Sequence, residues 1–183
     1  MDTPRIAIGL SASDNMPFDS AMCLLESMVN LPYPGIICAI KSSFIHNNRN
    51  MIVEKARQAK CNYLMFVDCD MLYENDGIER LLKQNKDIIG GMYNFRRLPI
   101  ENLVRDFNGQ TETFKVNFLP TGFMLVKMEV FDKLEKPYFF FEWDDEHHLD
   151  GDDSYFCRKA VKAGIGLWCD PTIKLRHIGL YNY

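Results

Sequence analysis

Long apolar runs are missing from this sequence of 183 residues, and none approaches the roughly 18 residues that a membrane-spanning helix needs. Residues 1–5 lead into a short strand-like run and lack the apolar core of a secretory signal. Basic residues are not in excess either, because 21 Lys and Arg stand against 25 Asp and Glu and give a net charge of −4. Such a balance does not attract nucleic acid. We therefore expect a cytoplasmic protein with no transmembrane segment and no nucleic-acid partner.

Closely spaced cysteine pairs are absent as well. None of the six cysteines has the Cys-x-x-Cys spacing, and most of them lie within apolar runs. This distribution is typical of reduced, buried thiols rather than of disulfides or a zinc site. Internal repeats, low-complexity tracts and linkers are also missing, and the length suits one α/β domain. We expect a single domain over residues 1–183.

The first half of the sequence alternates apolar runs of strand length with segments of helical period. Strands are expected over residues 5–10, 36–40, 63–67 and 87–93, and helices over residues 18–29, 48–60 and around 78–82. Such alternation is typical of a doubly wound sheet with mainly parallel strands. The predicted fold class is therefore α/β, with a single-domain, mainly parallel, twisted sheet flanked by helices.

The second half of the sequence lacks the regular alternation of strand and helix segments that the first half shows. Residues 95–110 are polar and irregular, and we expect them to form a loop that shapes a substrate site. The remaining expected elements are strands at 113–119, 123–127, 166–170 and 173–177, a short helix at 129–134 and a longer helix at 154–163.

Two aspartates, Asp68 and Asp70, directly follow the buried strand at residues 63–67. Ligands of open α/β sheets lie beyond the carboxyl ends of the strands, and carboxylate oxygens bind hard divalent cations. We expect an extended chain here, along which alternation points both side chains to the same side, where they can bind one ion while Cys69 faces the core. Each aspartate could instead cap the following turn. The two residues alone leave metal binding and capping open.

A second acidic pair, Asp152 and Asp153, lies where the helix at 154–163 is expected to begin. One of these carboxylates could cap the helix while the other serves as a base. His177 comes late in the chain, and a single histidine is more often structural than a ligand. His147 and His148 lie in an acidic stretch, where solvation or contact with a substrate is expected rather than metal binding.

Taken together, these motifs resemble those of glycosyltransferases with the A-type (GT-A) fold, and most closely the small, family-2-like nucleotide-sugar transferases. The resemblance rests on the order and spacing of the Asp68-Cys-Asp70 motif and of residues 121–126, 151–160 and 177–179. It also includes Arg49-Asn50 and residues 90–93, so it covers nearly the whole chain.

The resemblance implies a role for each motif. Asp68, Asp70 and His177 would hold Mn²⁺ or Mg²⁺, and Asp153 would be the base that deprotonates the acceptor. Asp152 stands where the family usually has Glu, and it would contact the acceptor. The residues that would flank the nucleotide are Ser11, Ala12, Asp14, Arg49, Asn50 and Asp68.

The resemblance also implies a reaction. A sugar would move from a nucleotide-diphosphate donor, a UDP- or GDP-sugar, to a hydroxyl of a glycan or another acceptor, with inversion at the anomeric carbon. The donor would bind to residues 1–93, and residues 94–183 would supply the acceptor and catalytic part. Tyr93, Trp143 and Trp168 could stack against a sugar, or belong to the core.

Two other functions remain open. A Mg²⁺-dependent aspartyl-phosphate hydrolase also uses an Asp-x-Asp pair after a strand. In that class the pair normally ends the first strand and carries Thr or Val two residues on, whereas here two strand units precede it and Leu72 takes that position. A non-catalytic carbohydrate-binding domain could keep the fold without turnover.

Overall fold

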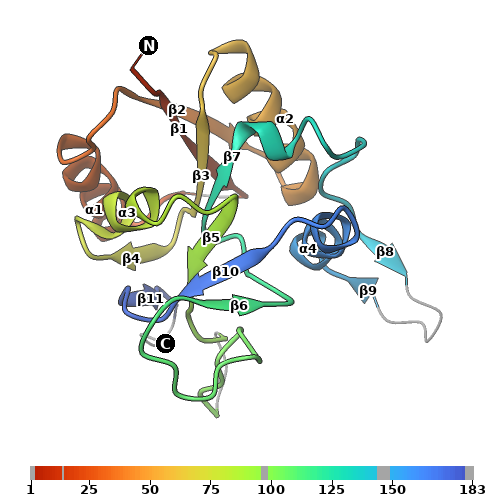
Figure 1. The fold of residues 1–183 in the computed structure, drawn as a ribbon. Coiled ribbons are helices and arrows are strands. Elements are labelled where there is room, and N and C mark those ends of the chain that lie inside the picture. The colour runs from red at the N-terminus through yellow and green to blue at the C-terminus, as the bar shows by residue number, and fades with distance from the viewer. Residues whose placement is uncertain (1–2, 14, 96–98, 144–148, 180–183) are drawn as a thin grey trace.

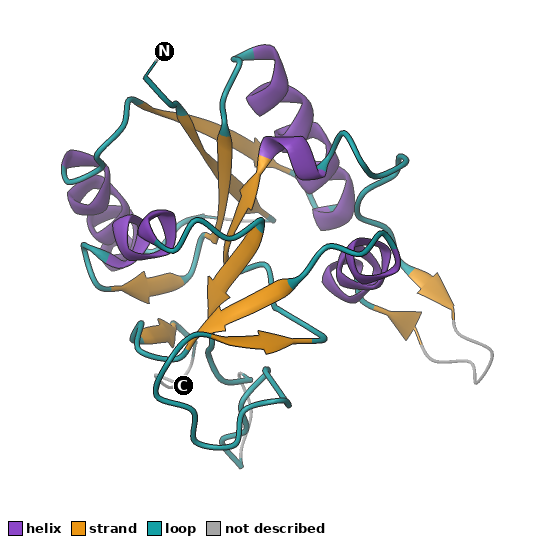
Figure 2. Cartoon of the chain, viewed as in Figure 1, coloured by secondary structure: helices purple, strands orange, loops and turns teal. Residues whose placement is uncertain are grey.

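A seven-stranded sheet forms the centre of the computed structural model, which describes residues 3–13, 15–95, 99–143 and 149–179 (Figures 1 and 2). The strands lie in the order β2 (Gly35–Lys41), β1 (Ile6–Ala12), β3 (Tyr63–Asp68), β7 (Phe123–Lys127), β5 (Ile88–Gly91), β10 (Leu167–Asp170) and β6 (Phe114–Val116).

Five of these strands point in one direction, and β7 and β6 run against them. The predicted α/β class with a mainly parallel sheet is therefore confirmed. Strand β7 is inserted between β3 and β5, with Phe123 opposite Val67. This insertion brings Gly122, whose carbonyl accepts a hydrogen bond from the amide of Asp68 at 3.0 Å, to the end of β3.

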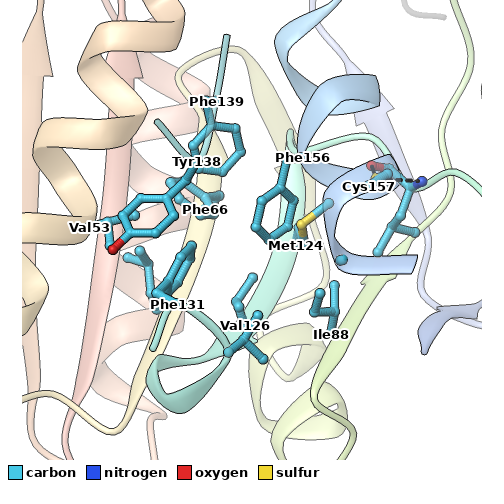
Figure 3. Close-up of a cluster of buried hydrophobic side chains, with 14 of the residues drawn as sticks. Val53, Phe66, Ile88, Met124, Val126, Phe131, Tyr138, Phe139, Phe156 and Cys157 are labelled. Atoms are coloured by element: carbon cyan, nitrogen blue, oxygen red, sulfur yellow. Dashed lines mark hydrogen bonds between the residues drawn. The ribbon is translucent and has the colours of Figure 1, made fainter. Parts of the chain in front are cut away.

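Helices cover both faces of the sheet. They are α1 (Phe18–Val29), α2 (Ile45–Gln58), α3 (Gly77–Lys83) and α4 (Asp152–Lys162), with a short 3₁₀ turn at Met128–Val130. Helices α2 and α4 share one apolar cluster with the sheet, in which the rings of Phe139 and Phe156 stack at 4.7 Å (Figure 3). Helices α1 and α3 pack on the other face, in a second cluster.

Two small strand pairs lie outside the main sheet. Strand β4 (Met71–Tyr73) pairs antiparallel with β11 (Leu175–His177), and β8 (Glu142–Trp143) pairs with β9 (Leu149–Asp150). Strand β4 was not expected from the sequence. The chain turns at Cys69 and Asp70 to begin it, so the expected extended path through Asp70 was wrong.

Several boundaries also differ from the expected ones. Helix α4 starts at Asp152 because Gly151 is the extended residue before it, with φ −69° and ψ 156°. Helix α2 begins three residues earlier than expected, and the helix expected at 129–134 is only the 3₁₀ turn. All six cysteines are free thiols, as expected, and Cys69 alone is half-buried. Within the described ranges, no helix is long and apolar enough to cross a membrane.

Candidate active site

The candidate site lies at the carboxyl ends of the central strands. Ser11 and Ala12 end β1, and Ser11 is directly opposite Asp68, the last residue of β3. The Ser11 hydroxyl is buried without a hydrogen-bond partner in the described structure. Parallel strands present their carboxyl ends to the same edge of the sheet, which explains why these residues meet.

Arg49 lies at the centre of the site and is buried. Its Nη2 donates to Asp68 Oδ1 at 3.2 Å, and its Nη1 donates to Asp152 Oδ2 at 2.6 Å. Burial alone would lower the pKa of the guanidinium, but the carboxylates of Asp68 and Asp152 raise it above its ordinary value. Arg49 therefore stays charged and links the end of β3 to the start of α4.

The two acids at the start of α4 have different surroundings. Asp152 is buried and pairs with Arg49. Asp153 is half-buried, and its Oδ1 accepts a hydrogen bond from the amide of Ser154 at 2.9 Å. Burial raises the pKa of Asp153, with Asp152 adding to the increase and Arg49 opposing it. A carboxyl group with a raised pKa is suited to accept a proton.

Asp153 also lines a cavity of about 880 Å³. The start of α4 forms one wall. The other wall consists of Phe95 and of residues between 103 and 118, which include Leu103, Arg105 and Phe118. The segment expected to shape a substrate site thus supplies part of this wall. A cavity of this size has room for a ligand larger than one sugar, since small-molecule pockets span roughly 300–1,000 Å³.

Asp70 and His177 meet because β4 pairs with β11, and the amide of Ile178 donates to the Asp70 carbonyl at 2.8 Å. His177 Nε2 lies 3.2 Å from Asp70 Oδ1, yet neither ring nitrogen of this buried histidine has an aligned hydrogen-bond partner among the described residues. Adjacent ligands of an octahedral cation with bonds of about 2.1 Å lie about 3 Å apart.

Asp70 and His177 therefore fit two positions on a divalent cation. In the described part of the chain, no group of three or more His, Cys, Asp or Glu side chains is already arranged to hold a metal.

Two further residues belong to the site: Gly122, to which the sequence analysis assigned no role of its own, and Tyr93, which it left open between stacking on a sugar and lying in the core. The Gly122 amide donates to the Tyr93 hydroxyl at 2.9 Å, and a Cβ on Gly122 would lie 2.2 Å from that oxygen and 3.0 Å from Asp68 Oδ2. Burial raises the pKa of Tyr93, so its hydroxyl stays neutral. The Tyr93 ring is buried edge-on against His177, with the ring centroids 5.0 Å apart, which is the core alternative stated for it. The glycine within residues 121–126 was the available signal.

The side chain of Asn50 does not join the site around Arg49 and Asp68. Its carboxamide donates to the carbonyls of His46 and Phe139 and accepts from the amides of Tyr138 and Phe139. The side chain thus anchors residues 138–139.

Other expected residues also lie elsewhere. Trp143 is exposed, and Trp168 is half-buried beneath Lys86, whose Nζ lies 4.0 Å from the ring centroid. Asp14, His147 and His148 lie outside the described residues.

Sequence comparison finds no matching family model and no similar curated protein. Comparison of structures finds A197 from STIV, at 16% identity and a TM-score of 0.67, over 96% of this chain and 86% of that one. It also finds S. aureus TarS 1–349 in complex with UDP-GlcNAc, at 10% identity and a TM-score of 0.52. That match covers 90% of this chain but only 55% of TarS 1–349. These matches establish a GT-A-like fold.

Proposed function

We propose that this chain is a metal-dependent glycosyltransferase, which moves a sugar from a nucleotide-diphosphate donor to an acceptor hydroxyl with inversion. The observation that carries the proposal is the position of Asp153, a carboxyl group with a raised pKa in the wall of a large cavity and within the same site as Arg49 and Asp68. The similarity to TarS, which was solved with UDP-GlcNAc, supports a UDP-sugar as donor, although a GDP-sugar remains a candidate.

Asp70 and His177 would hold Mn²⁺ or Mg²⁺. Asp68 lies two residues before Asp70, at the end of β3. The bound cation would supply positive charge to the departing diphosphate. Ser11 and Ala12, at the end of β1, would border the nucleotide.

Asp153 and Arg49 have the remaining roles in the proposed reaction. Asp153 accepts the proton of the acceptor hydroxyl. Its raised pKa makes the carboxylate a stronger base than an ordinary aspartate. Arg49 holds Asp152 and thereby fixes the first turn of α4, which carries the base. A base on the acceptor side, opposite the leaving diphosphate, gives one in-line displacement and an inverted product.

The experiment is a panel of UDP- and GDP-sugars with Mn²⁺, scored for donor hydrolysis and for transfer to glycan acceptors. Asp153→Asn should lower turnover by about 10²- to 10⁴-fold and leave donor affinity unchanged. Asp132→Asn is the matched control, because that exposed carboxylate is not among the residues that line the cavity and is ion-paired with Arg57. Asp70→Ala and His177→Ala should each weaken Mn²⁺ binding, measured by calorimetry.

Three outcomes would contradict the proposal. Retained anomeric configuration in the product NMR spectrum would remove Asp153 as the base. Release from no donor, with Asp70→Ala behaving like the wild type, would refute the transferase. A binding function that survives Asp153→Asn unchanged would instead favour the non-catalytic carbohydrate-binding domain.

The phosphohydrolase alternative makes a separate prediction, a covalent phosphoenzyme at Asp68. The ion pair between Asp68 and Arg49 speaks against it, because a guanidinium contact makes a carboxylate less nucleophilic.

A further inference from the structure

Strand β2 is a long edge of the seven-stranded sheet. It lies at the end of the strand order, pairs with β1 over all seven of its residues without a bulge, and pairs with no other strand in the described ranges. Proteins normally protect such an edge with proline, charge, a bulge or a covering element, because an unpaired edge pairs readily with another strand. Strand β2 contains no proline, and its only charged residue is Lys41, at its end.

The outward groups of this edge are the backbone N–H and C=O of alternate residues. The Ser42 amide donates to the Ala12 carbonyl at 2.9 Å, so the even-numbered residues of β2 direct their backbone groups toward β1. The backbone groups of Ile37 and Ala39 therefore point away from the sheet. Among the described residues, these outward groups have no hydrogen-bond partner.

The two helices nearest β2 leave this edge accessible. Helix α2 lies over the neighbouring strand, since a Cβ on Gly9 of β1 would lie 2.6 Å from Ile52 Cγ2. On the other face, the chain after α1 borders the start of β2, where a Cβ on Gly35 would lie 3.0 Å from Leu31 Cδ1. Ile37, further along the strand, is 46% exposed. Another strand can therefore approach β2 from the side.

Strand β2 is complementary to itself in an antiparallel pairing. Only a pairing centred on Cys38 brings all seven residues of one copy opposite all seven residues of the other. This register places Ile37 opposite the partner's Ala39, so that the outward backbone groups of the two residues meet as a hydrogen-bonded pair. The pairing has two-fold symmetry and forms a closed dimer rather than an open fibre.

The side chains also match in this register. Ile36 lies opposite the partner's Ile40, and such cross-strand pairs of β-branched residues stabilise a sheet. Lys41 lies opposite the partner's Gly35, so the charged residue of β2 does not face its own copy. The exposed Lys55 of α2 acts on the thiol at the centre of β2. Two copies bring two such lysines to one face, where salt screens their repulsion.

The surroundings of β2 favour a second copy over a foreign peptide. A peptide that extends a sheet gains its specificity from pockets for its alternate side chains. In the described structure, the cavities of about 880, 490 and 640 Å³ have no lining residue from β2. A second copy needs no pocket, because its own strand supplies the matching residues.

We propose that two copies of this chain associate through β2, antiparallel around Cys38, and join their sheets into one. At about 3.3 Å per residue the paired strands are only about 23 Å long, which is small beside the ~800 Å² per partner of a standard interface. The dimer is therefore weak, with a dissociation constant of about 10 to 100 µM.

Sedimentation velocity of the whole chain from about 1 to 500 µM tests the association, and the mass should rise from monomer to dimer across this range. Ala39→Pro removes an outward amide and keeps the hydrogen bonds to β1, so it should weaken the dimer at least about tenfold. Ala39→Lys should do the same by adding positive charge beside Lys41. Val161→Lys, at an exposed apolar site on α4, is the matched control and should leave the dimer unchanged.

Amide hydrogen exchange followed by NMR locates the interface. The amides of Ile37 and Ala39 should exchange about threefold or more slowly at about 500 µM than at about 20 µM. The Cys38 amide, which is directed toward β1, should exchange slowly at both concentrations.

The proposal is overturned if the chain stays monomeric up to about 500 µM, or if the dimer forms equally well in both Ala39 variants. It is also overturned if dimerisation leaves the exchange of Ile37 and Ala39 unchanged. Circular dichroism melting checks that each variant is folded, and Ala39→Lys, at an exposed position, keeps the test decisive if the proline variant does not fold. None of these measurements depends on sugar transfer, so this proposal and the transferase proposal can fail separately.

Discussion

Replacing Arg49 by methionine should destabilise the protein through the two carboxylates that it leaves behind. The side chain of Asp152 is 8% exposed and that of Asp68 is 25% exposed, so neither is well hydrated. Removing one partner of a buried ion pair costs about 3–5 kcal/mol. For a domain of this size, 1 kcal/mol corresponds to about 2–4 °C in Tm, so the midpoint should fall by about 10 °C.

Urea denaturation and thermal melting at pH 7 measure this loss. The double variant Arg49→Met/Asp152→Asn should recover part of it, because only Asp68 then lacks its cation. Arg57→Met is the matched control, since Arg57 pairs with the exposed Asp132 and should cost no more than about 1 kcal/mol.

Two results would refute this reasoning. A loss below about 1 kcal/mol for Arg49→Met would mean that the carboxylates find other partners or water. A double variant that is no more stable than the single one would mean that the loss comes from packing of the Arg49 side chain instead of from charge.

Asp153→Asn should raise the free energy of unfolding at pH 7 by on the order of 1 kcal/mol, because burial raises the pKa of Asp153 and so disfavours its ionised form in the folded protein. The stabilities of the wild type and the variant should converge as the pH falls toward about 4, the ordinary pKa of an aspartate. Melting curves from about pH 4 to 8 measure this. Gly122→Ala should cost about 2 kcal/mol through the clash with the Tyr93 hydroxyl, and Tyr93→Phe should relieve part of it, both read from urea midpoints. Asn50→Ala should lower the free energy of unfolding by about 2 kcal/mol, because residues 138–139 lose their hydrogen bonds to the Asn50 side chain. The affinity for UDP, measured by calorimetric titration, should not change. Weaker UDP binding would mean that Asn50 does contact the nucleotide.

The elements of the fold were largely predictable because they depend on local patterns. Apolar runs and helical spacing identified most strands of the main sheet and all four helices, and their alternation indicated the α/β class. Strand pairing was not predictable. The antiparallel place of β7 between β3 and β5 and the pairing of β4 with β11 join residues about 35 to 105 positions apart, and no local pattern specifies such partners.

The site divides in the same way. The sequence by itself determined that Asp68 and Asp153 stand at the end of a strand and the start of a helix, because burial and capping act over a few residues. Only the tertiary structure decided that Arg49 pairs with Asp152, 103 residues away, and leaves the neighbouring Asp153 at the cavity. A buried cation needs its carboxylates close in space. The placement of α2 and α4 on the same face of the sheet selects which acids those are, and no spacing in the chain does so.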